Sequence, residues 1–275
     1  MNTEKFIDVR KIIKEKNPTL YRWIPSFLIN YIEKILHQKE INQFLIDNKD
    51  QFNVDFCIEV IKMLNVKIDI QGIENIPKSG KIVLVMNHPL GGMDAMALVS
   101  ALKDHREDLK FIVNDILLHI ENLNGIFVGV NKHGKNGISK REQLAELFAT
   151  DNAVCVFPAG LVSRKINSEI KDLQWKKTFI TLSKEHNRTI IPIFIDGKLS
   201  NFFYRLANFR KRIGIKANIE MLYLSNEFYK LRNKNIFIKV GEPIPYDSLP
   251  QEMNPQKQAS WVKEKVYELQ KNNDT

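Results

Sequence analysis

Hydrophobic and polar positions divide the chain into a helical beginning and a longer part in which strands alternate with helices. Over residues 20–38, apolar side chains recur every three or four positions, which is typical of an amphipathic helix. Pro25 is expected to kink this stretch or to open its main helix. A second helix is predicted over residues 53–65, so residues 1–65 are interpreted as an N-terminal helical extension. These helices either pack on the following domain or lie in the plane of a membrane, and the sequence leaves both alternatives open.

From residue 66 onward, short apolar runs alternate with helical patterns. The runs are of the β type and lie at residues 66–72, 81–87, 109–114, 125–130, 153–158, 189–197 and 235–244. Helices are predicted at residues 94–104, 138–150, 170–186 and 255–271. This alternation predicts an α/β fold in which a mixed, largely parallel sheet is flanked by helices, as one domain over residues 66–275.

Composition excludes several classes of protein. With 44% hydrophobic residues in 275, the chain can bury a core, so it is not a disordered protein. No run approaches the roughly 18 apolar residues of a membrane-spanning helix, and the N-terminus lacks the apolar core of a signal peptide, so we expect a cytoplasmic protein. Cys57 and Cys155 stand in apolar surroundings and are expected to be buried thiols. The six histidines are dispersed, so no metal site is expected.

Positive charge gathers in one segment. The net charge is +9, and residues 198–239 hold ten Lys or Arg against two acids, with eight aromatic residues among them. Such a segment suits an anionic membrane surface, an acidic carrier protein or nucleic acid, and it is equally compatible with an ordinary solvated face. Because no nucleic-acid-binding motif accompanies the charge, no nucleic-acid partner is expected.

The stretch "NHPLGGMD" at residues 87–94 follows an apolar run and holds a histidine and an aspartate. A carboxylate at Asp94 can hold Nδ1–H of His88 and leave Nε2 as a general base. Asp94 also stands where a helix should begin, so its alternative role is that of a helix N-cap. The motif alone leaves both roles open.

Four blocks together resemble the glycerolipid acyltransferase superfamily, which has an Asn-His-x4-Asp motif. These blocks are "MNHPLGGMD", "GIFVGVNK" (125–132), "VFPAGLVSR" (156–164) and "IIPIFIDG" (190–197), in the order that the superfamily shows. The resemblance implies that His88 takes a proton from an acceptor hydroxyl that attacks an acyl thioester, with Asp94 orienting the histidine. It implies no cofactor and no covalent acyl-enzyme. Backbone N–H groups at Gly91 and Gly92 could stabilise the oxyanion.

This chain departs from the superfamily pattern in two blocks. Five residues instead of four separate His88 from Asp94, and we expect Gly91 and Gly92 to absorb the extra residue through positive φ angles, although they would equally suit an ordinary tight turn. In the third block, Ala159, Leu161 and Val162 replace the Glu, Thr and Arg of the superfamily, which argues against a phosphate-bearing acceptor. The residues expected to shape the substrate site are Asn87, Gly91, Gly92, Phe157, Pro158, Gly160, Ser163, Arg164, Lys176 and Lys177. Arg164, Lys165, Lys176 and Lys177 could bind an anion such as an acceptor carboxylate, and the alternative for each lysine is a solvated surface charge.

Within the superfamily, the motifs and "DLQWKKTF" (172–179) look most like a haemolysin-like bacterial branch. That branch implies O-acylation of a lyso-ornithine or lyso-glycine lipid, an acyl carrier protein or acyl-CoA donor, and a peripheral location on the inner face of the cytoplasmic membrane. Three alternatives remain: a lysophosphatidate acyltransferase, a thioester hydrolase, and a non-catalytic basic module that binds membrane or nucleic acid.

Overall fold

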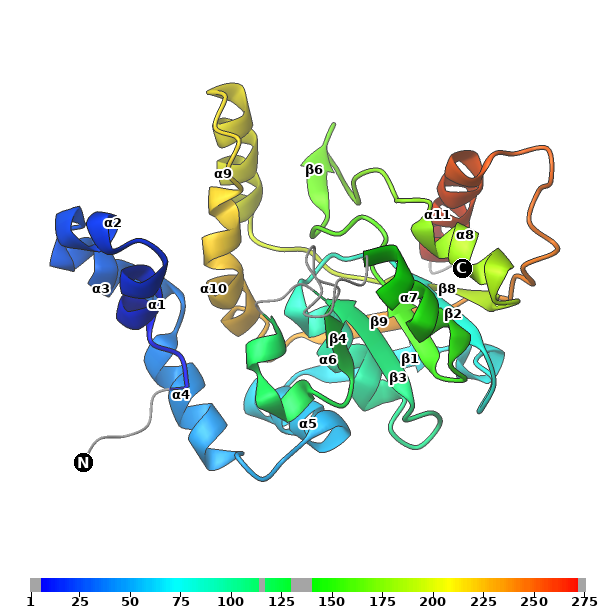
Figure 1. Ribbon diagram of the computed structural model, residues 1–275, viewed down its shortest axis with the longest axis horizontal. Helices are drawn as coiled ribbons and strands as arrows, with labels where there is room; N and C mark the ends of the chain where they lie inside the picture. Colours follow the sequence, from blue (N-terminus) through cyan, green and yellow to red (C-terminus); the bar gives the residue numbers. More distant parts are fainter. Residues whose placement is uncertain (1–5, 114–116, 130–139, 272–275) are drawn as a thin grey trace. The chain divides into compact units, whose positions relative to one another are not determined.

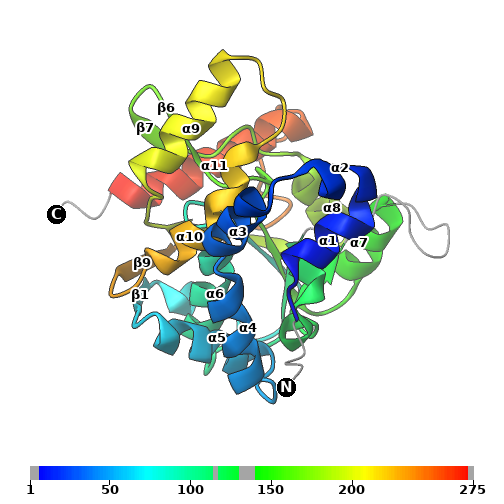
Figure 2. The same ribbon diagram turned by 90° about the vertical axis from the view of Figure 1, so that its left-hand side faces the viewer.

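The computed structural model describes residues 6–113, 117–129 and 140–271 (Figure 1 and Figure 2). The chain divides into two compact units. The helical unit consists of Met1–Gln51 and Leu199–Arg232, and the sheet unit consists of Phe52–Lys198 and Asn233–Thr275. The predicted boundary at residue 65 stays a prediction, although by compactness residues 52–65 group with the sheet and residues 199–232 group with the N-terminal helices.

The sheet unit contains a seven-stranded sheet in the order β1-β9-β8-β2-β5-β3-β4. Every neighbouring pair is parallel except β8 and β9, which run antiparallel. The strands are β1 (Lys67–Gln71), β2 (Ile82–Met86), β3 (Leu109–Val113), β4 (Phe127–Gly129), β5 (Ala153–Val156), β8 (Thr189–Ile195) and β9 (Asn235–Val240). Each of the seven predicted runs contains one of them. The predicted fold class, a mixed and largely parallel sheet flanked by helices, is confirmed.

Helices cover both faces of this sheet (Figure 1). Each residue of the central strand β2 is buried, as expected for a strand with helices on both sides. On one face, Val83 and Val85 pack in a cluster with Phe148, Phe179 and other apolar residues. The helices of this face are α7 (Lys140–Ala149), α8 (Thr178–Glu185) and α11 (Pro255–Lys271), while α5 (Asn53–Met63) and α6 (Gly92–Ala101) cover the other face. Strand β2 pairs with β5 and β8 along its edges and packs against helices on its faces, which places it at the centre of the unit.

The prediction of one helix over residues 170–186 is wrong at its beginning. Strands β6 (Arg164–Ile166) and β7 (Glu169–Lys171) form an antiparallel hairpin, and α8 begins only at Thr178. Asn167 and Ser168 join the strands with φ angles of 47° and 69°. Two successive residues with positive φ make the hairpin turn that matches the strand twist, and this turn interrupts any helix.

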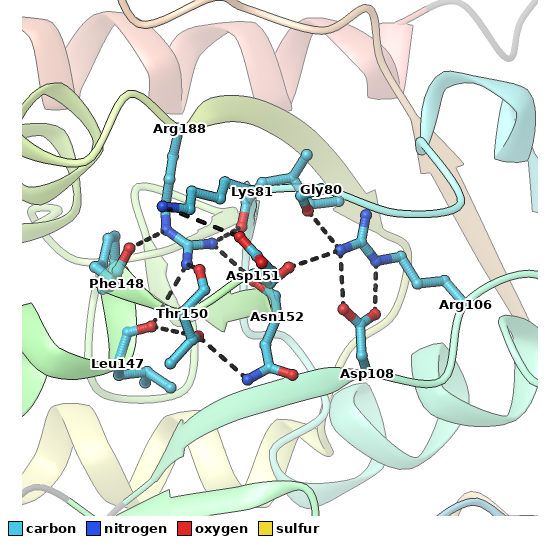
Figure 3. A network of polar contacts seen from close by, with 11 residues as sticks. Gly80, Lys81, Arg106, Asp108, Leu147, Phe148, Thr150, Asp151, Asn152 and Arg188 are labelled. Carbon is cyan, nitrogen blue, oxygen red and sulfur yellow. Dashed lines mark hydrogen bonds and ion pairs between the residues drawn. The ribbon is translucent and has the colours of Figure 1, made fainter.

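Two buried arginines hold the edge of the sheet at which β2 begins (Figure 3). The fully buried guanidinium of Arg188 donates to five backbone carbonyls, those of Ile82, Leu147, Phe148, Thr150 and Asn152. Burial lowers the pKa of Arg188 to about 10, which leaves it charged at neutral pH. Arg106 pairs with Asp108 and donates to the carbonyls of Pro77, Gly80 and Asp151. The end of α7 is thereby fastened to the start of β2.

The helical unit joins the N-terminal helices to a segment from the second half of the chain. Its helices are α1 (Val9–Lys16), α2 (Pro18–Trp23), α3 (Ser26–Ile35), α4 (Gln38–Asp47), α9 (Asn201–Arg212) and α10 (Leu224–Tyr229). Pro25 lies between α2 and α3 and occupies the N-cap of α3, so the prediction that it opens the main helix is confirmed. The Tyr31 and Tyr223 hydroxyls lie 2.8 Å apart, and His37 stacks on Tyr229. Among the described residues, no helix is both long enough and apolar enough to span a bilayer.

Candidate active site

Two loops of the predicted site leave the same edge of the sheet. Strands β2 and β5 are parallel neighbours, and the residues that follow them are 87–91 and 157–163. Because the carboxyl ends of parallel strands open toward one edge, chemistry in α/β sheets gathers there. The order of the strands thus brings the first and third sequence blocks together.

His88 and Asp94 form the predicted pair. Nδ1 of His88 lies 2.8 Å from Oδ2 of Asp94, which is fully buried, while 18% of the His88 side chain is exposed. An ionised carboxylate can only accept, so Nδ1 carries the hydrogen and the lone pair remains on Nε2. Within the described part of the chain, Nε2 has no hydrogen-bond partner. The ring is therefore held in the tautomer that a general base requires.

Asp94 does not serve as a helix N-cap, so that alternative is wrong. Helix α6 begins at Gly92 with Gly91 at its N-cap, and Asp94 stands in the first turn. The Leu90 N–H donates to both carboxylate oxygens, at 3.0 and 3.2 Å, so the carboxylate reaches back over the loop. Burial raises the pKa of the Asp94 carboxyl, and the hydrogen bonds from His88 and the Leu90 N–H act in the opposite direction. The aspartate closes the loop that presents His88.

Only one of the two glycines of the motif has the expected positive φ angle. Gly91 has a φ of 69° and a ψ of −134°, a conformation that favours glycine, so this half of the prediction is confirmed. Gly92 is the first residue of α6 and does not have a positive φ, so the prediction for Gly92 is wrong. Gly92 needs no positive φ because it already belongs to the helix.

We expect Gly91→Ala to lower the free energy of unfolding by about 1–3 kcal/mol, because its backbone conformation excludes a side chain. The matched control is Gly92→Ala. An added Cβ there meets no atom within 4 Å, and alanine favours a helix, so this variant should be neutral or slightly more stable. Urea denaturation of both proteins measures the difference. Equal destabilisation of the two variants would contradict this explanation.

Phe157 and Asn87 hold the imidazole ring of His88 and the start of its loop in place. Phe157 stacks on the imidazole with a centroid distance of 4.1 Å. The side-chain amide of Asn87 is buried and exchanges two hydrogen bonds with the backbone of Ile195 in β8, at 2.7 and 2.8 Å. Asn87 thus connects the start of the motif loop to strand β8. Its role is structural, beside the His88 ring.

Of the other predicted site residues, Pro158, Ser163 and Arg164 are buried, and Gly160, Lys176 and Lys177 are exposed. Pro158 is buried within the loop that follows β5, Gly160 takes a φ of 68° there, and the Ser163 N–H donates to the His88 carbonyl at 2.8 Å. Lys176 and Lys177 are exposed, and Nζ of Lys176 lies beside Gly160. Arg164 is buried, and its guanidinium donates to the Val162 carbonyl. Residues 130–132 of the second sequence block lie outside the described residues.

A cavity of 370 Å³ adjoins the motif loop. It is lined by Asn87, Pro89, Ser163, Ser168, Ile170, Phe194, Ile195, Asp196, Gly197, Lys198 and Gln270. The residues on either side of His88 belong to its wall, as do the hairpin residues Ser168 and Ile170. His88 itself does not line this cavity, whose wall contains both charged and apolar residues.

One residue of the site, Asp172, was not singled out by the sequence reasoning. Its carboxylate accepts hydrogen bonds from the His88 N–H, the Ser163 hydroxyl and the Trp175 indole. It lay within the "DLQWKKTF" block that carried the resemblance, but nothing in its spacing connected it to a histidine 84 positions earlier.

The two cysteines are buried, as predicted. Burial raises the pKa of the Cys57 thiol to about 12 and that of Cys155 further still, so neither thiol is ionised at neutral pH. In the described ranges, no group of three or more His, Cys, Asp or Glu side chains is arranged to hold a metal ion.

The chain belongs to the acyltransferase family, whose sequence model matches residues 11–275, and it is an acyltransferase enzyme. A lyso-glycine lipid O-acyltransferase from Phocaeicola vulgatus is 42% identical over 264 residues, which are 96% of this chain and 95% of that protein. The lyso-glycine lipid O-acyltransferase of Bacteroides thetaiotaomicron is 43% identical over 264 residues, covering 96% and 97% of the two chains. The resemblance inferred from the motifs is confirmed.

A solved structure shares the fold. The crystal structure of the 1-acyl-sn-glycerophosphate (LPA) acyltransferase PlsC from Thermotoga maritima matches 98% of this chain and 94% of its own, with a TM-score of 0.51. Its sequence identity is 18%, so this likeness concerns the fold alone.

Proposed function

We propose that this enzyme transfers a fatty acyl group from an acyl thioester to the hydroxyl of a lyso-glycine lipid. The observation that carries the proposal is the 42–43% identity, over nearly the whole of both chains, to two lyso-glycine lipid O-acyltransferases. The substitutions in the third block agree, because Ala159 and Val162 stand where the superfamily places groups for a phosphate-bearing acceptor. Membership of the haemolysin-like branch stays a prediction.

In the proposed reaction, His88 is the general base and Asp94 orients it. Nε2 takes the proton of the acceptor hydroxyl as the oxygen attacks the thioester carbonyl. A C–O bond forms, the C–S bond breaks, and the thiolate leaves with the proton that His88 returns. In the first turn of α6 the Asp94 N–H donates to the Gly91 carbonyl, which leaves the N–H groups of Gly92 and Met93 as those that can donate to the developing oxyanion. This route needs no cofactor.

The acceptor head group would lie beside the motif loop. The 370 Å³ cavity offers space next to Asn87 and Pro89, and Lys198 belongs to its wall. Lys176 supplies a second cation beside Gly160. A glycine carboxylate can pair with an ammonium group as a point charge and does not need the bidentate arginine that suits phosphate. Arg164 is a weaker candidate than the sequence suggested, because it is buried against the backbone.

The experiment that tests the function compares two acceptors. Purified enzyme would be incubated with acyl carrier protein or coenzyme A thioester, and either an N-acyl glycine with a free chain hydroxyl or lysophosphatidate. We expect diacylated product from the glycine lipid, at a rate at least about 100 times that with lysophosphatidate, because the third block lacks the phosphate-binding arginine. Equal use of lysophosphatidate would favour the alternative lysophosphatidate acyltransferase. Thioester consumption without an acylated product would favour a hydrolase.

We also propose that the helical unit binds an anionic membrane surface. Of the fourteen large apolar side chains that are exposed among the described residues, eleven belong to this unit, including Trp23 (81% exposed) and Phe27 (74%). Both acids of residues 198–239 are buried, where Glu220 pairs with Arg210 and Glu227 with Lys230. Five further cations of that segment belong to the helical unit: Arg205, Lys211, Arg212, Lys216 and Arg232. Exposed aromatic side chains together with several cations suit an anionic bilayer. Docking of an acidic carrier protein on the same segment is the competing proposal.

The double variant Trp23→Ala/Phe27→Ala should bind vesicles that contain phosphatidylglycerol at least about 10-fold more weakly. Burial of each aromatic side chain is worth about 1.5–3 kcal/mol. Phe52→Ala is the matched control, because Phe52 is 51% exposed but belongs to the sheet unit. Cosedimentation with vesicles measures both variants. Unchanged binding of the double variant would contradict the membrane assignment.

A further inference from the structure

Three hydrogen bonds form a closed ring that fixes the main chain of His88. Its N–H donates to Oδ1 of Asp172 at 3.2 Å, and its carbonyl accepts from the Ser163 N–H at 2.8 Å. The Ser163 hydroxyl donates to the same Oδ1 of Asp172, at 2.5 Å. Both polar groups of the His88 main chain are therefore held by residues outside the motif loop, and these two residues also bind each other.

Asp172 is itself anchored on every side. It is buried, and its other oxygen accepts from Nε1 of Trp175 at 2.8 Å. Its N–H donates to the Tyr267 hydroxyl at 2.8 Å, and its carbonyl accepts from Nζ of Lys263 at 2.7 Å. Tyr267 and Lys263 belong to α11, so the carboxylate is fixed by a long helix as well as by its own connection between β7 and α8. An anchored acceptor can set the position of a donor that binds it.

The chemistry at this position requires a carboxylate. Three donors, from His88, Ser163 and Trp175, meet two oxygens that only accept when ionised. An asparagine side chain would keep the shape but place an N–H₂ group against at least one of these donors. The negative charge also acts on the catalytic pair, because Asp172 contributes to raising the pKa of Asp94, after burial as the main cause.

We propose that Asp172 is a positioning residue for acyl transfer: by holding the His88 main chain it keeps the imidazole between Asp94 and Phe157. With the ring fixed at Nδ1 by Asp94 and on its face by Phe157, a shift of the His88 backbone would break one of these contacts. The inference rests on the proposed role of His88 as the base. A catalytic group that is displaced by about 1 Å can lose about 100-fold in rate, so the loss of a positioning partner should lower activity about 10–100-fold.

The test is Asp172→Asn in the full-length enzyme, with three measurements. We expect kcat to fall about 10–100-fold while the KM for the acceptor stays within about 2-fold, because the ring moves and the substrate contacts do not. We expect the acidic limb of the pH profile of kcat to move to lower pH, because a negative charge beside the pair is removed. In protein labelled with ¹⁵N-histidine, we expect the Nδ1–H signal of His88, assigned with His88→Ala, to shift or broaden.

Asp108→Asn is the matched control, since Asp108 also accepts from a buried partner, Arg106, but precedes β3 at the opposite edge of the sheet. It should change stability and leave kcat of the folded protein, the pH limb and the His88 signal unaltered. If Asp172→Asn does not fold, Ser163→Ala removes one bond of the ring and keeps the charge. It should lower kcat about 3–10-fold, following the loss of one buried hydrogen bond, without moving the pH limb.

An unchanged His88 signal together with an unchanged kcat, in Asp172→Asn or in Ser163→Ala, would overturn the proposal. A loss of activity that merely follows the folded fraction, with an unmoved pH limb in Asp172→Asn, would overturn it as well. The histidine signal needs no turnover. A failure of His88 as the base would appear as retained activity in His88→Ala, and the two proposals are thereby separable.

Discussion

His88→Ala is expected to lower kcat for acyl transfer by about 10²–10⁴-fold, the contribution of a positioned general base. Alanine cannot take the hydroxyl proton, and the alcohol must then attack the thioester unassisted or with water as the base. Thioester binding and the fold should be retained, because the main-chain bonds of His88 to Asp172 and Ser163 do not depend on its side chain, and Asp94 keeps the hydrogen bonds from the Leu90 N–H. Release of thiol, followed with an acceptor present and absent, measures the effect.

His119→Ala is the control for this prediction. His119 is an exposed histidine of the same unit, so its loss removes an imidazole without touching the motif loop. Its kcat should equal that of the unsubstituted enzyme. Full activity of His88→Ala would show that another group is the base, and the proposed reaction would have to be abandoned while the family membership would stand.

Arg188→Met should destabilise the protein more than any other single change considered. Five carbonyls would lose their donor inside the structure, and each buried acceptor left unsatisfied costs about 1–3 kcal/mol. Because the surrounding structure can relax in part, we expect the free energy of unfolding to fall by at least about 4 kcal/mol. This is a large part of the stability of an ordinary domain. Arg188→Lys keeps the charge and three donors and should recover part of the loss. Urea denaturation followed by circular dichroism measures all three proteins.

Arg141→Met is the matched control for Arg188→Met. The Arg141 side chain is 74% exposed and meets Glu185 at 3.4 Å, a surface ion pair of the kind that contributes about 0–1 kcal/mol. If the two methionine variants unfolded at the same urea concentration, the carbonyl network of Figure 3 would not stabilise the fold in the way that its geometry indicates.

The sequence was most informative where one physical demand dominated. Strands buried on both faces appear as unbroken apolar runs, and for that reason β2 and β8 could be located closely. The hairpin of β6 and β7 was not predicted, because its strands are three residues long and its turn depends on positive φ angles at Asn167 and Ser168. Helix α9 was missed because its charges and aromatics were read as a surface property of residues 198–239 instead of a helical pattern.

In the site too, residues of a local motif could be predicted, and residues that act through distant contacts could not. His88 and Asp94 are six positions apart, so a local motif could reveal them. Asp172 and Arg188 act through bonds to residues far away in the chain, and a single buried acid or arginine carries no pattern in sequence. Gly91 was predictable as a flexible point, but only the beginning of α6 showed that Gly92 is not one.

The segment 198–239 has one more consequence. It contains no histidine, the side chain whose ordinary pKa lies in the range in which cells operate, and its two carboxylates pair with Arg210 and Lys230, so the charge it offers to a partner comes from Lys and Arg side chains. Acidification should therefore not release this protein from an anionic partner, whereas a modest rise in ionic strength should.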